Sequence, residues 1–126
     1  MTENEISYEI RGAIFSVHNY FGPGLFESVY KAALMKELAA RGLRVMCEVP
    51  IPVFYHEEKL DEIGFKIDIM VEGKVIIEIK SIENLLPVHH KQIITYLKLT
   101  EIKLGILVNF NCVDIANNIF RKVNGL

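Results

Sequence analysis

Two acidic residues and a lysine interrupt stretches of the chain that are otherwise apolar. Glu78 stands within VIIEIK, residues 75–80, and Lys80 follows it with one residue between them. Asp68 is the only acid within FKIDIM, residues 65–70. Burying an unpaired carboxylate is costly, so a metal ion, a cation or a place at the sheet rim must compensate. If the two stretches are neighbouring strands, Asp68 and Glu78 supply oxygen ligands for a hard metal ion, with Lys80 on the same face of its strand as Glu78.

The same three residues have an alternative interpretation. They would line a solvated face and pair with one another, since acid–lysine spacings are common by chance. The stretch from residue 74 to residue 80 is apolar on both faces up to its charges, which is typical of a central, buried strand. This character favours a functional site over a solvated face.

Two expected helices carry further candidates. Glu27 begins the helix expected from about Phe26 to Arg41, where the helix dipole alone already favours an acid. Its helical stripe continues through Tyr30, Leu34 and Leu38, which suggests that Glu27 points inward.

The second of these helices is expected from Pro87 to about Thr100. Its residues His89, Gln92 and Tyr96 are three and four positions apart and therefore occupy one face. A solvated helix face would explain these three residues equally well.

Alternating and helical patterns predict the order ααβββαβα, an α/β fold with a mixed sheet flanked by helices. A capping box at Thr2 and Glu5 begins the first helix, and Gly22-Pro23-Gly24 ends it. The remaining elements are expected at residues 26–41, 43–55, 63–71, 74–80, 87–100, 104–110 and, as a closing helix, 113–123. Pro50 and Pro52 place the first strand at a sheet edge. No repeat or linker divides residues 1–126, which predicts a single domain.

A shared acidic site sets a condition on the turn between the second and third strands. A two-residue turn at 72–73 would pair Val71 with Lys74 and place Asp68 and Glu78 on opposite faces. The site therefore requires an odd offset, such as a three-residue turn or a bulge near Gly73, which would bring Asp68 opposite Glu78. The aliphatic neighbours are then expected together on the other face: Ile67, Ile69, Ile77 and Ile79.

Composition restricts the class of protein. The 126 residues carry a formal net charge of -2, which counts mildly against nucleic-acid binding. No apolar run reaches the roughly 20 residues of a membrane helix, and the acidic, polar beginning does not resemble a signal peptide. We therefore expect a cytoplasmic protein without membrane contact. Cys47 and Cys112 belong to no CxxC-type pair, so both are expected to be reduced and buried.

Several segments together resemble the GxxExxY protein family. Its signature matches GLFESVY, residues 24–30, through Gly24, Glu27 and Tyr30. The resemblance extends through VHNYFGPGLFESVY, EVPIPV, LLPVHHKQIITYLKLT and LGILVNF, nearly the whole chain. That family looks like a branch of the PD-(D/E)xK nuclease superfamily, whose αβββαβ core agrees with the order above. No "PD" pair is present, because Asp68 follows Ile67.

The resemblance implies a metal-dependent nuclease acting on nucleic acid, with DNA the expected substrate. It implies catalytic roles for Asp68, Glu78, Lys80, Gln92 and Tyr96, with the last two matching a QxxxY motif. The implied ligands of Mg²⁺ or Mn²⁺ are Glu27, Asp68 and Glu78, together with the Ile79 carbonyl.

Other functions stay open at this point. The chain could be a catalytically silent module that binds nucleic acid or a partner protein, or a structural domain with ion-paired acids. A chain of this size could also require a homodimer to grip duplex DNA.

Overall fold

The computed structural model follows the backbone over residues 1–126 and describes the side chains of residues 1–60 and 64–126. The elements follow one another in the order α1 (Glu3–Phe21), α2 (Glu27–Ala40), β1 (Val45–Tyr55), β2 (Glu58–Val71), β3 (Val75–Lys80), α3 (Pro87–Thr100), β4 (Leu104–Asn109), a 3₁₀ turn (Ile115–Asn118) and β5 (Ile119–Val123). None of the helices in the described residues is long and apolar enough to cross a membrane.

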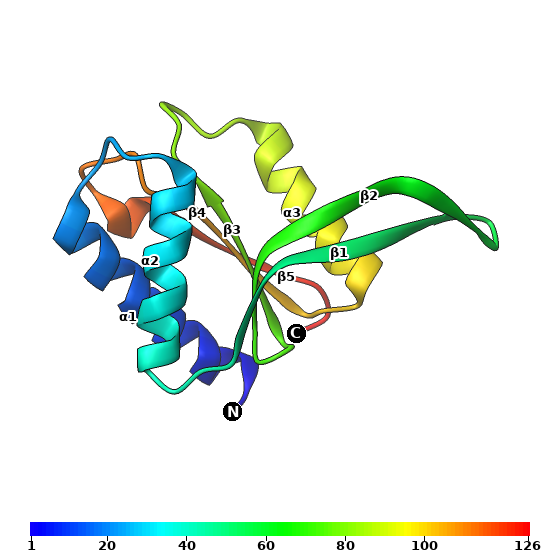
Figure 1. The fold of residues 1–126 in the computed structure, drawn as a ribbon, viewed down its shortest axis with the longest axis horizontal. Coiled ribbons are helices and arrows are strands. Elements are labelled where there is room, and N and C mark those ends of the chain that lie inside the picture. Colours follow the sequence, from blue (N-terminus) through cyan, green and yellow to red (C-terminus); the bar gives the residue numbers. More distant parts are fainter.

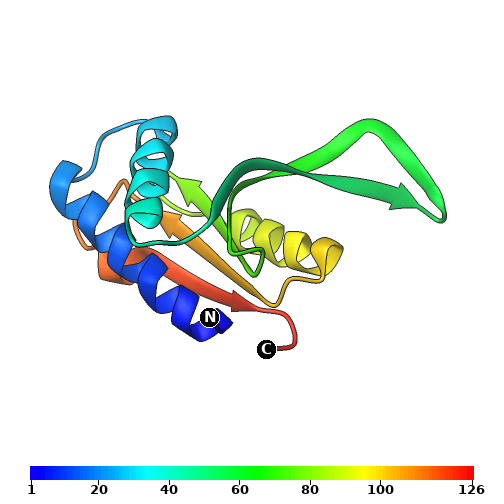
Figure 2. The same ribbon diagram turned by 60° about the horizontal axis from the view of Figure 1, so that its bottom comes forward.

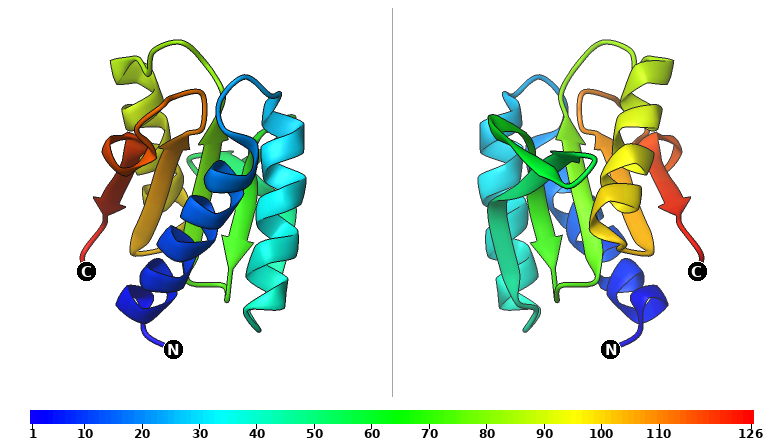
Figure 3. Two further views of the ribbon diagram at one scale, coloured as in Figure 1. Left: turned by 90° about the vertical axis from the view of Figure 1, so that its left-hand side faces the viewer. Right: turned by 90° about the vertical axis from the view of Figure 1, so that its right-hand side faces the viewer.

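One mixed sheet forms the centre of the fold, with the strand order β1-β2-β3-β4-β5. Only β3 and β4 run parallel, and the long crossover between them contains α3. Helices α1 and α2 cover one face of the sheet, and α3 covers the other (Figure 3). The α/β class and the mixed, helix-flanked sheet are therefore confirmed. So is the edge position of β1, the strand that contains Pro50 and Pro52.

Two apolar clusters hold these layers together. The larger lies between the sheet and α1 and α2 and includes Tyr30, Leu34 and Phe110. The smaller lies beneath α3 and includes Tyr96 and Leu97. Helix α3 approaches β4 closely because Gly105 has no side chain: a Cβ there would lie 2.9 Å from the Ile93 Cδ1 atom.

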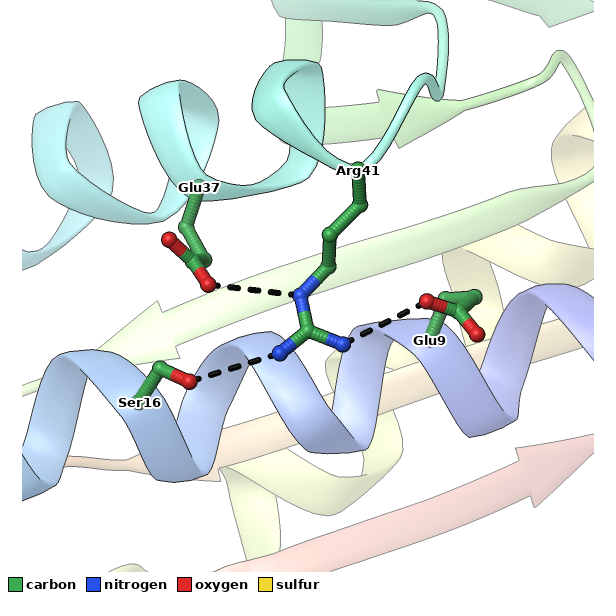
Figure 4. Close-up of polar contacts among 4 residues, drawn as sticks. All are labelled: Glu9, Ser16, Glu37 and Arg41. Carbon is green, nitrogen blue, oxygen red and sulfur yellow. Dashed lines mark hydrogen bonds and ion pairs between the residues drawn. The ribbon is translucent and has the colours of Figure 1, made fainter.

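The first two helices begin close to where the sequence predicts. The capping box at Thr2 and Glu5 is formed, and the Gly22 N–H closes α1 on the His18 carbonyl. At the other end of α2, the Arg41 guanidinium contacts Glu37 on its own helix and Glu9 and Ser16 on α1 (Figure 4). This contact joins the C-terminal end of α2 to α1.

Strands β1 and β2 are much longer than β3, and they extend beyond the rest of the sheet as a hairpin (Figures 1 and 2). We call residues 49–67 the arm. The base of the arm is twisted. As a result, Ile69 packs under α1 and α2, whereas Ile67, two residues before it, packs in the cluster under α3. Glu48, opposite this point, has a φ of 51°. The expectation that Ile67 shares a face with Ile69, Ile77 and Ile79 is therefore wrong.

The expected closing helix at 113–123 is also wrong. The segment forms a short 3₁₀ turn and then strand β5, whose Ile119 pairs with Val108 of β4. Asp114, Asn117 and Asn118 are weak helix formers, and the backbone of the buried strand β4 needs a partner on its free edge.

The two cysteines are less buried than expected. Both cysteines are free, but Cys47 on edge strand β1 is exposed and Cys112 is only half-buried. Ile63, which the alternation placed at the start of the second strand, lies outside the residues whose side chains are described.

Candidate active site

The turn between β2 and β3 has the odd offset that a shared site requires. Val71 pairs with Val75, so three residues form the turn, and the pairing continues to Ile69 and Ile77. Two of the turn residues have positive φ, 54° at Glu72 and 63° at Gly73. Glycine adopts such values without strain. The predicted register is confirmed, and it brings Asp68 level with Glu78.

Beyond the last paired residues, Ile69 and Ile77, hydrogen bonds to the two carboxylates replace the backbone hydrogen bonds between β2 and β3. The Asp68 N–H donates to Glu78 Oε1 at 3.2 Å, and the Ile79 N–H donates to Asp68 Oδ2 at 2.8 Å. Each acid therefore accepts a hydrogen bond from the opposite strand at the point where β2 leaves β3 to enter the arm. The two side chains lie together at the base of the arm, near the carboxyl end of β3.

Glu78 is the more deeply buried of the two acids. Only 6% of it is exposed, whereas Asp68 is half-buried. Burial first and the neighbouring Asp68 charge second raise the pKa of Glu78 to about 9, and the positive charge of Lys80 opposes this shift. A carboxylate in this position is held in its neutral form at pH 7 unless a further cation arrives.

Lys80, Gln92 and Tyr96 meet on the side of the sheet that α3 covers. They line one pocket of about 540 Å³, here called the α3 pocket. Its lining is completed by Phe65, Val88, His89, Lys91 and Thr95. The structure therefore brings together the lysine of strand β3 and the polar face predicted for the third helix.

Tyr96 connects this pocket to the acids. Its side chain is almost fully buried, and its ring lies 5.1 Å from that of Phe65. Burial, followed by the charges of Glu78 and Asp68, raises the pKa of Tyr96 to about 12. The hydroxyl stays protonated at neutral pH and is suited to donate a hydrogen bond rather than to accept a proton.

Glu27 lies on the other side of the acids. Its side chain is exposed rather than directed inward, so that expectation is wrong; the inward stripe of α2 begins at Tyr30. Glu27 and Asp68 nevertheless line the same small pocket of about 190 Å³, which we call the acid pocket. Its other lining residues are Ser28, Lys31, Glu48 and Ile79.

The position of Glu27 is set by a buried tyrosine. Tyr30 is fully buried, stacked on Phe110 with ring centroids 4.5 Å apart. Its hydroxyl donates to the Gly22 carbonyl and accepts from the Leu25 N–H at 3.2 Å, while the Ser81 hydroxyl donates to the Leu25 carbonyl. These bonds hold the loop at residues 22–25, which leads into Glu27, beside the end of β3.

Two residues of the acid pocket were missed in the sequence. Glu48 of β1 lies between Cys47 and Val49, which pair with Ile69 and Ile67 on either side of Asp68. It forms an ion pair with Lys31 of α2, and Asp68 also contributes to the raised pKa of Lys31. The alternating pattern of β1 marked Glu48 only as a polar position, and it could not reveal the positive φ or the partner on α2.

The donor set suits a hard cation better than a soft one. Asp68 and Glu78 supply carboxylate oxygens, and no group of three acidic, histidine or cysteine side chains in the described residues is arranged to hold a metal by itself. Mg²⁺ keeps several waters and usually takes only one or two protein carboxylates. The two acids fit such an ion, whereas a closed zinc site would need four nitrogen or sulfur ligands.

Comparison with known proteins gives one match. A family model described as the PD-(D/E)XK nuclease superfamily matches residues 4–122. No curated protein and no solved structure matches the chain significantly.

Proposed function

Because the chain belongs to the PD-(D/E)XK nuclease superfamily, we propose that it is a metal-dependent nuclease that hydrolyses phosphodiester bonds in DNA. The observation that carries the proposal is the meeting of Asp68 and Glu78 across the end of the β2–β3 ladder. Lys80 follows on the same strand, as the D…ExK pattern requires. A more specific membership, in the GxxExxY branch, is supported by Gly24, Glu27 and Tyr30 and is part of this proposal.

In this proposal Asp68 and Glu78 hold Mg²⁺ or Mn²⁺, with the Ile79 carbonyl and Glu27 as additional oxygen ligands. When bound there, the ion would supply positive charge that makes water easier to deprotonate and offsets negative charge on a phosphate. Burial of Glu78 supports this role, because its ionised form lacks sufficient positive charge nearby. Tyr30 acts indirectly, by holding the loop that positions Glu27.

Lys80 orients the attacking water and stabilises the negative charge that develops on the phosphate. Gln92 and Tyr96 donate hydrogen bonds to the water or to the DNA backbone from the wall of the α3 pocket. The Tyr96 hydroxyl keeps its proton at neutral pH, which a hydrogen-bond donor requires.

A cleavage assay tests the proposal. We expect the wild-type protein to cut labelled single- or double-stranded DNA with Mn²⁺ or Mg²⁺, and to be inactive after chelation with EDTA. The control is Asp68→Asn, which keeps the size of the side chain and removes its charge. Absence of cleavage of every substrate with either ion, or equal cleavage by Asp68→Asn, would contradict a nuclease function at this site.

A further inference from the structure

The α3 pocket continues onto the arm. A second pocket of about 390 Å³, here called the arm pocket, lies along the arm and is lined by residues that include Pro50, Lys59, Phe65 and Lys66. Phe65 lines both pockets, so the two adjoin. Together they form a track that begins at Lys80 and Gln92 and extends along the arm, which projects from the sheet in Figure 1.

The charge of this track differs from that of the chain. The formal net charge of the protein is -2, yet none of the lining residues whose side chains the structure describes is acidic. Four lysines line the track: Lys59, Lys66, Lys80 and Lys91. These lysines, which adjoin the proposed catalytic acids, are complementary to a polyanion.

An aromatic ring lies where the two pockets meet. Phe65 is 38% exposed, and its ring packs against Tyr96 on one side. A large aromatic side chain left partly open between lysines offers a surface on which a nucleic-acid base can stack. Bases in a duplex are already stacked on one another, so only an unpaired base is free to use such a surface.

The dimensions of the pockets agree with an unpaired strand. Volumes of 390 and 540 Å³ fall within the range of about 300–1,000 Å³ that is typical of small-molecule pockets. Each pocket therefore has room for a unit of nucleotide size.

We propose that the arm and α3 pockets form a binding track for single-stranded nucleic acid, in which a base stacks on Phe65 and Lys59 and Lys66 contact phosphates. The inference rests on the proposed function for its catalytic meaning and names the substrate class. The arm guides an unpaired strand toward Asp68, Glu78 and Lys80.

Binding measured by fluorescence anisotropy tests this track without any need for cleavage. The probes are labelled oligothymidine, oligouridine and a DNA duplex, each about 12 residues long per strand and therefore within the range of single-strand binding sites. All are measured in EDTA and again with Ca²⁺. We expect the wild-type protein to bind at least one of the single strands more tightly than the duplex, and the two single strands distinguish DNA from RNA.

Two variants probe the contacts. Phe65→Leu keeps an apolar side chain against Tyr96 but removes the aromatic face, so single-strand affinity should fall by about fivefold or more. Lys59 is exposed on the arm, so Lys59→Ala should reduce the magnitude of the slope of log affinity against log salt concentration by about 0.7. The matched controls are Tyr8→Ala on α1 and Lys36→Ala on α2, both at exposed positions on the side of the sheet opposite to α3. Both variants should bind the single strands as tightly as the wild type does.

The outcomes separate this inference from the proposed function. Equal affinity for duplex and single strand, or unchanged binding in both arm variants, overturns the track even if the protein cleaves DNA. The expected binding pattern supports the track even if no metal produces cleavage, in which case the protein is a binding module and the nuclease proposal alone is wrong.

Discussion

Replacing Lys80 with alanine is expected to reduce the rate of phosphodiester cleavage by about a hundredfold or more, the usual effect of removing a group that stabilises developing charge. Lys80 is the last residue of β3 and is half-buried. Truncation removes the ammonium group near the carboxylates without opening a cavity in the core, so the fold should persist. Initial rates with saturating Mn²⁺ and circular dichroism of both proteins measure the two effects.

The matched control for this substitution is Lys36→Ala, which removes the same charge from an exposed position on α2. It should cleave at the wild-type rate. Cleavage by Lys80→Ala at the wild-type rate would show that the activity arises elsewhere, whereas loss of its helical signal would require the milder Lys80→Met to repeat the comparison.

The second large effect concerns the stability of the metal-free protein as a function of pH. The folded-state pKa of Glu78, about 9, lies above its ordinary value of 4.5. Between these two values the folded protein keeps a proton that the unfolded chain releases, so stability falls as pH rises. The slope from this one group is about 1.4 kcal/mol per pH unit. Below pH 4.5 its contribution is fully present, and above pH 9 it is lost.

Glu78→Gln tests this effect, because its amide is neutral at every pH. Urea unfolding in EDTA at pH 6, 7, 8 and 9 should give a wild-type free energy of unfolding that declines more steeply than that of the variant. Glu83→Gln, at an exposed loop position, is the control and should follow the wild type. Parallel curves for wild type and Glu78→Gln would mean that the buried carboxyl ionises without cost.

The sequence was most informative where local pattern and burial agree. Pro87 begins α3 and Thr100 ends it, as proline at a first turn and helical spacing predict. The β2–β3 register followed from a chemical condition rather than from propensity: two acids on opposite faces cannot share an ion, and Gly73 permits the turn that avoids this.

Features that depend on contacts between distant segments were not predictable. The alternation of β1 and β2 indicated one buried face, but the arm twists at its base and passes Ile67 from one core to the other. β5 was mistaken for a helix because its pairing with β4 outweighs a weak local preference. The ion pair of Lys31 with Glu48 joins a helix to an edge strand, which no spacing along the chain reveals.

In the proposed mechanism Asp68 and Glu78 together hold a divalent metal ion. A crystal of the protein soaked in Mn²⁺ and measured for anomalous scattering tests it most directly. We expect a peak at about 2.0–2.6 Å from a carboxylate oxygen of each residue, the range for oxygen ligands of hard cations. The peak should be absent in Asp68→Asn crystals. A wild-type crystal that binds Mn²⁺ elsewhere, with no peak between these two acids, would contradict the account.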